Sequence, residues 1–117
     1  FELNRDVLKK EVAAIKQEYF RLKSNDPGKY DFSATAVANV AEWLFDRGHK
    51  QKAIEVLEFC TALEPKESRW YEYIGDVYKE WNKKKQAYEW YEKALSLAPE
   101  DQELQGKLKN VKPGNQH

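Results

Sequence analysis

The 117-residue sequence has a single cysteine, Cys60, which cannot form an internal disulfide. Cysteine usage therefore neither requires an oxidising compartment nor excludes one. No apolar run approaches the roughly 20 residues that a membrane helix needs, and no signal peptide is recognisable. Because the chain begins with Phe1 rather than Met, we interpret it as a processed chain or a piece of a longer one. We expect no membrane partner and leave the compartment open: cytoplasmic, or periplasmic if the chain is part of an exported protein.

An excess of charge of one sign is also missing, since 20 basic residues balance 20 acidic ones. A dedicated nucleic-acid or anionic-membrane binder carries a clear positive excess. The one basic and aromatic cluster is Lys83 to Lys85, between Trp81 and Trp90. Single-stranded nucleic-acid binding would need such a mixture, but Glu80 and Glu89 lie beside it, and lysines in a turn are ordinarily solvated. We therefore expect no nucleic-acid partner.

Motifs for catalysis and metal binding are missing as well. The sequence contains no Gly-x-Ser-x-Gly elbow, Ser-x-x-Lys motif, phosphate-binding loop or dinucleotide fingerprint. His49 and His117 have no Cys or second His nearby that would complete a metal-ligand set. Cys60 is interpreted as a small buried hydrophobic residue. The sequence thus predicts that this chain is not an enzyme and holds no cofactor and no metal.

Two amphipathic helices are predicted between Ser68 and Asp101, joined at Asn82 and ended by Pro99. Their apolar or small residues recur at helical spacing: Tyr71, Ile74, Gly75 and Tyr78 in the first helix, and Ala87, Tyr91, Ala94 and Leu95 in the second. Four tryptophans exceed what so small a core can hold, so Trp81 and Trp90 are expected to be partly exposed.

A second helix pair is predicted upstream. Ser33 can cap a helix that runs to about Arg47, and Gly48 can end it in a left-handed conformation. His49 to Leu63 forms the partner helix, which Pro65 stops. The apolar or small positions repeat those of the later pair: Val37, Val40, Ala41, Leu44, Ala53, Leu57 and Cys60.

The two helix pairs resemble tetratricopeptide repeats. Counted from Ser68, the later pair has an aromatic residue, an aliphatic residue and glycine at the fourth, seventh and eighth positions, and every other signature position is filled. Pro65 and Pro99 are 34 residues apart, which is the period of this repeat. The resemblance implies an all-α fold: an antiparallel helix array in a right-handed superhelix that serves as a binding scaffold for proteins or peptides. It also implies that the two helices of the later pair cross at Gly75, where only a small residue fits.

Helices flank the two repeats. Asn4 can cap a helix that extends to about Lys23, followed by a turn-rich linker in which Tyr30 and Phe32 are expected to pack on the domain. After Asp101 a closing helix is predicted, with only Leu104, Leu108 and Val111 apolar, as in a terminal cap. We therefore divide the chain into residues 1–32, which pack on the stack, and residues 33–117, the repeat domain with its cap.

The resemblance also implies which residues line the concave groove, namely those at five positions of each first helix. They are Thr35, Ala38, Glu42, Phe45 and Asp46 in one repeat and Arg69, Glu72, Asp76, Lys79 and Glu80 in the other. This set holds five acids and two bases, which favours a partner with some basic character. An ordinary solvated helix face explains the same charges, so both interpretations stay open.

One subtype of the family clamps the C-terminal carboxylate of chaperones through Lys and Asn residues. The corresponding positions here hold Ala38, Glu42 and Tyr73. Because Glu42 would repel a carboxylate, the sequence does not predict a chaperone-tail binder.

A looser resemblance covers most of the chain. Some bacterial serine hydrolases and esterases carry a similar C-terminal helical module, whose linker matches Tyr30, Phe32 and Ser33, although its first unit often has Leu-Gly where this chain has Val40-Ala41. This resemblance implies the alternative function: a docking or dimerisation domain whose catalytic domain lies upstream of Phe1. Self-association is compatible with either interpretation.

Overall fold

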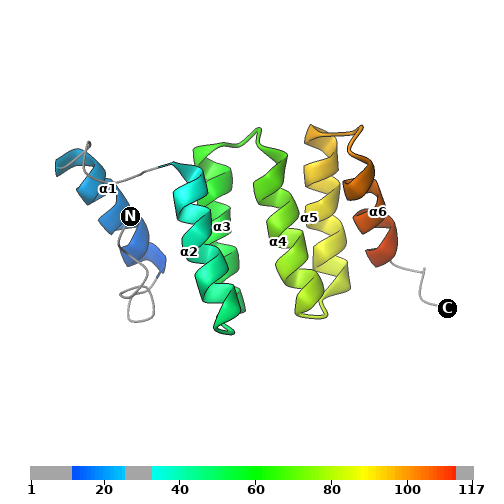
Figure 1. Cartoon of the computed structure of the whole chain (residues 1–117), viewed down its shortest axis with the longest axis horizontal. Helices are drawn as coiled ribbons and strands as arrows, with labels where there is room; N and C mark the ends of the chain where they lie inside the picture. Colours follow the sequence, from blue (N-terminus) through cyan, green and yellow to red (C-terminus); the bar gives the residue numbers. More distant parts are fainter. Residues whose placement is uncertain (1–11, 26–32, 113–117) are drawn as a thin grey trace. The chain divides into compact units, whose positions relative to one another are not determined.

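The computed structural model describes residues 12–25 and 33–112 of the chain. In these two ranges the chain is all-α, without strands (Figure 1). The helices are α1 (Val12–Asn25), α2 (Ala34–Asp46), α3 (Lys50–Leu63), α4 (Ser68–Glu80), α5 (Lys84–Leu97) and α6 (Gln102–Val111). The predicted fold class is confirmed.

The chain forms two compact units, Phe1–Leu63 and Glu64–His117. The first contains α1, α2 and α3, and the second contains α4, α5 and α6. Each helix pair predicted from the sequence therefore lies within one unit. The division at residues 32 and 33 and the right-handed superhelix stay predictions.

The helices follow the 34-residue period found in the sequence. The first helices of the successive pairs, α2, α4 and α6, begin at Ala34, Ser68 and Gln102, and the second helices α3 and α5 begin at Lys50 and Lys84. The closing helix α6 is therefore in register as the first helix of a third pair.

Matching motifs end α2 and α4. Gly48 has a φ of 85°, and Asn82, at the equivalent position of the second unit, has a φ of 61°. The next amide reaches back over the helix end in both cases: the N–H of His49 donates to the Leu44 carbonyl at 2.9 Å, and that of Lys83 to the Tyr78 carbonyl at 2.8 Å. These are the hydrogen bonds of a left-handed C-terminal cap. The helix ends predicted at Gly48 and Asn82 are confirmed.

The first unit packs α2 against α3, which run antiparallel in Figure 1. Ser33 caps α2 as predicted, since its Oγ accepts a hydrogen bond from the Ala36 N–H at 3.1 Å. Cys60 is fully buried, as predicted, and its Sγ contacts the Ala34 carbonyl at 3.5 Å. The contact of Cys60 with Ala34 joins the start of α2 to the end of α3.

Helix α1 contacts α3 through aromatic rings. Tyr19 is buried and meets Phe59 edge to face, with ring centroids 5.2 Å apart. The helix ends at Asn25, two residues beyond the predicted Lys23. The predicted start at Asn4 and the packing of Tyr30 and Phe32 lie outside the described residues.

The second unit is built on the contact between Gly75 of α4 and Tyr91 of α5. A Cβ atom at Gly75 would lie 2.6 Å from two ring carbons of Tyr91, closer than packed carbon atoms approach. The Tyr91 ring is fully buried, and Tyr71 and Tyr78 pack partly buried around the same core. The small residue predicted at the helix crossing is thus required by the Tyr91 ring.

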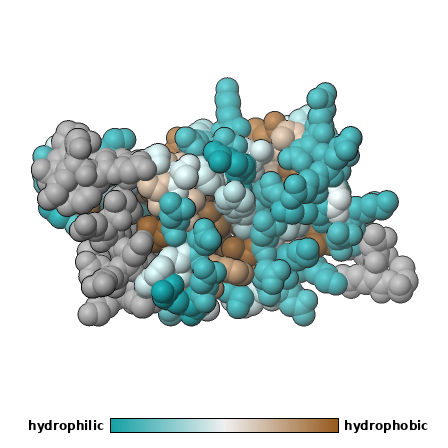
Figure 2. Space-filling view, viewed as in Figure 1, coloured by the Kyte–Doolittle hydropathy of each residue, from teal (hydrophilic) through white to brown (hydrophobic). Residues whose placement is uncertain are grey.

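Helix α6 closes this unit with a narrow apolar stripe. Leu104 and Val111 are buried with Tyr91 in one core, and Leu108 packs at its edge. Asp101 caps the helix, because its Oδ1 accepts a hydrogen bond from the Leu104 N–H at 3.1 Å. Figure 2 shows mainly hydrophilic side chains over α5 and α6 on the face in view. The closing helix predicted after Asp101 therefore forms, with one face on the core.

Alanine substitutions at the two helical glycines of the second unit should change the free energy of unfolding in opposite directions. Gly75→Ala should lower the free energy of unfolding by about 1–3 kcal/mol, because the added Cβ collides with the buried Tyr91 ring. Gly106→Ala should raise it by about 0.5–1 kcal/mol, because a Cβ there meets nothing within 4 Å and alanine favours the helix. Urea denaturation followed by circular dichroism measures both. Equal effects of the two substitutions would contradict the assigned crossing.

Candidate binding surface

The five groove residues predicted on α2 follow one face of that helix. Thr35, Glu42 and Asp46 are exposed, whereas Ala38 and Phe45 are partly buried. Their spacing of three and four residues places them along one stripe. This part of the prediction thus yields a surface in the first unit with two carboxylates at Glu42 and Asp46.

The five groove residues predicted on α4 follow the equivalent stripe in the second unit. Lys79 and Glu80 are exposed at its C-terminal end. Arg69, at the other end, pairs with Glu67 at 3.3 Å and lies over the Trp70 ring. A hydrogen bond from Arg69 to Glu67 raises the pKa of this guanidinium. The structure brings the remaining two residues, Glu72 and Asp76, into a polar cluster with α6.

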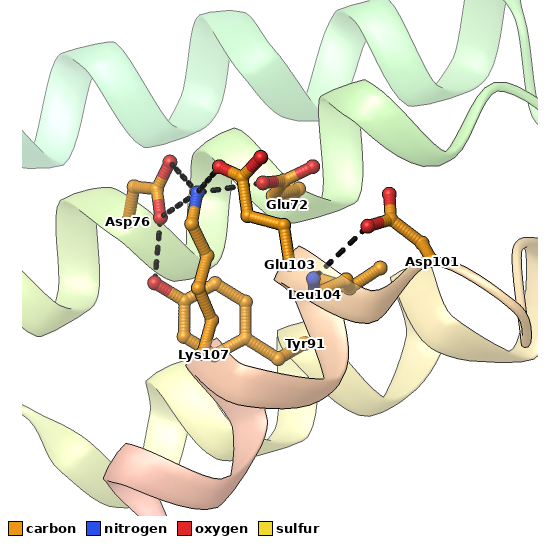
Figure 3. Close-up of polar contacts among 7 residues, drawn as sticks. All are labelled: Glu72, Asp76, Tyr91, Asp101, Glu103, Leu104 and Lys107. Carbon is orange, nitrogen blue, oxygen red and sulfur yellow. Dashed lines mark hydrogen bonds and ion pairs between the residues drawn. The ribbon is translucent and has the colours of Figure 1, made fainter.

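Lys107 of α6 is the centre of this cluster (Figure 3). Its Nζ lies 2.6 Å from Glu72 Oε2 and 3.2 Å from Asp76 Oδ1, and a third carboxylate, that of Glu103, is 3.9 Å away. Three carboxylates therefore surround one ammonium group, which leaves the cluster with a net negative charge. Two of the residues predicted to contact a ligand are already in contact with the chain's own lysine.

Tyr91 fixes the carboxylate of Asp76 through a hydrogen bond. Its hydroxyl donates a 2.6 Å hydrogen bond to Asp76 Oδ1 (Figure 3). Burial of the ring, followed by the hydrogen bond and the negative charge of Asp76, raises the pKa of Tyr91 well above its usual value. The phenol therefore stays protonated and acts as a hydrogen-bond donor.

The ammonium group of Lys107 is stabilised in its charged form. Burial lowers the pKa of Lys107, but hydrogen bonds to Glu72 and Asp76 and the charges of both residues outweigh it, so the pKa is raised overall. The Lys107 side chain keeps 24% of its accessible surface, and that of Asp76 keeps 37%. Solvent and solutes therefore reach the cluster.

Sequence reasoning missed Lys107 and assigned Tyr91 to the core alone. A usable signal was the 34-residue period, which places Gln102 at the register of Ala34 and Ser68. That register would have made α6 a third first helix and directed attention to its charged residues. The pairing of Lys107 with Glu72 depends on side-chain directions, which the period does not specify.

The tryptophans predicted to be partly exposed are so, and cations cover their rings. Lys83 lies 3.9 Å from the ring centroid of Trp81, and Lys93 lies 4.1 Å from that of Trp90. Each cation is attracted by the electron-rich ring face. Lys83, one lysine of the basic cluster, therefore already contacts the ring of the nearby Trp81. That the chain does not bind nucleic acids stays a prediction.

The described residues contain neither a membrane-spanning helix nor a metal-binding cluster. In residues 12–25 and 33–112, no helix is both long and apolar enough to cross a bilayer. The same part of the chain holds no group of three or more His, Cys, Asp or Glu side chains arranged to bind a metal ion.

The comparisons with known proteins point to one kind of repeat. Residues 71–101 match the family model of the tetratricopeptide repeat. No curated protein matches the chain. The matched segment contains Tyr71, Gly75, Tyr91 and Pro99, which include the residues of the α4 and α5 crossing.

Solved structures share the fold at low sequence identity. A crystal structure of MamA protein matches with a TM-score of 0.63 and 23% identity over 86% of this chain, which spans only 52% of that protein chain. The Sgt2 TPR domain from Aspergillus fumigatus matches with a TM-score of 0.60 and 22% identity, covering 95% of this chain and 75% of the domain. The first TPR of Spaghetti, bound to the HSP90 peptide SRMEEVD, matches with a TM-score of 0.61 and 20% identity, covering 93% and 86%.

These matches confirm the predicted kind of fold. A segment of the second unit matches the tetratricopeptide repeat model, and the chain as a whole folds like solved tetratricopeptide repeat domains. They give no support to the looser resemblance to the C-terminal modules of bacterial serine hydrolases, which stays a prediction.

The polar cluster predicts a loss of stability in alkali. Because the folded-state pKa values of Tyr91 and Lys107 are raised, their contribution is complete at neutral pH. It is lost as the pH rises beyond about 10, where the unfolded chain releases these protons first. The free energy of unfolding should fall there by up to roughly 1.4 kcal/mol per pH unit for each proton.

Tyr91→Phe tests this assignment, because it removes one of the two groups. Urea denaturation between pH 8 and pH 11.5 should show a shallower alkaline decline in this variant than in the wild type. Tyr73→Phe, at an exposed ring of α4, is the matched control and should keep the wild-type slope. Equal slopes in all three proteins would contradict the role of Tyr91.

Proposed function

We propose that this chain is a protein-interaction module and that the stripe on α4 binds a partner segment with basic side chains. The observation that carries the proposal is the pair of carboxylates at Glu72 and Asp76. The Tyr91 hydroxyl holds Asp76, and both carboxylates already contact an ammonium group at hydrogen-bonding distance. A cationic side chain from a partner fits the same contacts.

The charge of the predicted stripes supports this choice of partner. Across α2 and α4 they hold five acidic and two basic residues. Lys107 and Glu103, which the structure adds to the α4 stripe, cancel one another. One of the two basic residues, Arg69, is already paired with Glu67. A negative surface attracts basic segments and repels acidic ones.

The similar structure of Spaghetti holds an HSP90 peptide, SRMEEVD, with three acidic residues and one arginine. Binding of a peptide on this fold supports a peptide or a partner domain as the ligand here as well. The chemistry proposed for this chain is the opposite, because Ala38, Glu42 and Tyr73 stand where the carboxylate-clamping subtype has Lys and Asn. The α2 stripe with Glu42 is the second surface we propose for basic groups.

The proposed role is binding without catalysis. The ionisable groups at Glu72, Asp76 and Lys107 are paired with each other, and the hydroxyl that contacts them, that of Tyr91, is engaged as a donor to Asp76 (Figure 3). Accordingly we propose no substrate and no cofactor.

Neutralising the two central carboxylates tests the proposal. The double variant Glu72→Gln/Asp76→Asn keeps the size of both side chains and an acceptor for the Tyr91 hydroxyl. Its affinity for N-acetylated hexaarginine amide, measured by calorimetry at low ionic strength, should fall about tenfold, which corresponds to roughly 1.4 kcal/mol. The wild type should not bind N-acetylated hexaglutamate amide.

The control for this variant is Glu89→Gln/Glu92→Gln, which removes the same charge from exposed positions of α5. It should bind hexaarginine like the wild type if the α4 stripe is the binding surface. Equal losses in both double variants would show that only the overall charge matters, and the assignment of the surface would be rejected.

Self-association is the alternative, and the first unit offers one residue for it. The Phe20 side chain on α1 is 51% exposed, although its ring lies against those of Tyr19 and Phe59. If this aromatic patch joins two copies, sedimentation velocity should show a concentration-dependent dimer that Phe20→Ser dissociates. A monomer at all concentrations would reject this alternative.

A further inference from the structure

We propose that Lys107 is a built-in competitor for the cationic group of the partner, so that a basic ligand must displace it from Glu72 and Asp76. This inference rests on the proposed function and concerns the regulation of the same surface. In the structure, the Lys107 side chain makes the contacts with Glu72 and Asp76 that a ligand's lysine or arginine would make (Figure 3).

The position of Asp76 does not depend on Lys107 alone. Asp76 is held by the Tyr91 hydroxyl at 2.6 Å, and the Tyr91 ring is clamped against Gly75 in the core. Glu72 lies one helical turn before Asp76 on α4, and only 14% of its side chain is exposed. Release of Lys107 would therefore leave Asp76 oriented by Tyr91, with the carboxylate of Glu72 one turn away, for another cation.

Helix α6 does not depend on this ion-pair cluster for its position. Leu104 and Val111 are buried in the core of the unit, and Asp101 caps the first turn. Gln105 adds a 2.7 Å hydrogen bond from its Nε2 to the Pro99 carbonyl. The Lys107 side chain can thus leave its partners while the helix stays docked.

The charges around Lys107 favour exchange. Its ammonium group faces Glu72, Asp76 and Glu103, so one positive charge is shared among three negative ones. A partner that brings two or more cationic groups would match these carboxylates better than Lys107 does alone. The exposed part of the Lys107 side chain gives it a path to solvent. Lys107 would then set a threshold that a weakly basic ligand does not pass.

Lys107→Met tests the competition directly, because methionine keeps an unbranched apolar stem and removes the charge. Its affinity for N-acetylated hexaarginine amide should be roughly threefold to tenfold higher than that of the wild type in calorimetry. Lys109→Met is the matched control, since Lys109 is an exposed lysine of the same helix. It changes the net charge equally and should alter the affinity by less than about twofold.

The outcomes separate this inference from the proposed function. If Lys107→Met binds no tighter than Lys109→Met, while Glu72→Gln/Asp76→Asn loses binding, the competition is rejected and the binding surface stands. If neither the wild type nor Lys107→Met binds hexaarginine, both proposals fail. Circular dichroism of each variant shows whether α6 and the core remain folded.

A measurement on the wild-type protein covers the case that a variant does not fold. Acetylation of lysines, read by mass spectrometry, should be slow at Lys107 in the free protein because its amine is charged and paired. Saturation with N-acetylated hexaarginine amide, which offers no amine to the reagent, should raise the acetylation of Lys107 several-fold and leave that of Lys109 unchanged. Unaltered labelling of Lys107 at saturation would overturn the proposal.

Discussion

Tyr91 links the three helices of the second unit, α4, α5 and α6. Its ring packs against the bare backbone of Gly75 and so sets the distance between α4 and α5. Its hydroxyl donates a hydrogen bond to Asp76, and Asp76 in turn accepts one from Lys107 of α6. One side chain therefore joins all three helices of the unit, first through burial of an aromatic ring and then through a charge-assisted hydrogen bond.

This arrangement couples the core to the surface. The carboxylate proposed to bind a partner is positioned by a buried phenol, so its geometry is fixed before any ligand arrives. A positioned charge loses less conformational freedom on binding than a flexible one. Asp76 also contributes to folding, because its loss would leave the Tyr91 hydroxyl without its acceptor. For this reason Asp76→Asn, which removes the charge but keeps an acceptor for the Tyr91 hydroxyl, tests the role of the charge better than a charge-reversing substitution does.

The ion pairs of Lys107 contribute modestly to stability. The lysine keeps about a quarter of its surface in contact with solvent, and exposed pairs are worth about 0–1 kcal/mol. The buried residues Leu104 and Val111 hold α6 more strongly, since each buried aliphatic side chain contributes about 1.5–3 kcal/mol. A weak polar contact on a firmly held helix is suited to exchange with a ligand, because breaking it does not unfold the unit.

The sequence by itself determined the repeat and its ends. The 34-residue spacing, the Ser33 cap, the left-handed Gly48, the helix end at Asn82 and the small residue Gly75 all depend on local backbone geometry or on a single helix contact. Such features follow from residue type and spacing. The stripe of charged residues on α4 was also readable, because residues three and four apart share a helix face.

Only the tertiary structure decided what that stripe contacts. Lys107 is 31 and 35 residues away from Asp76 and Glu72, and neither spacing nor composition pairs these residues. The pairing requires α6 to dock on the second unit through Leu104 and Val111 with Lys107 directed at α4. That direction results from packing in three dimensions, which is why the sequence predicted Glu72 and Asp76 as ligand-binding candidates and the structure shows both of them paired with a lysine.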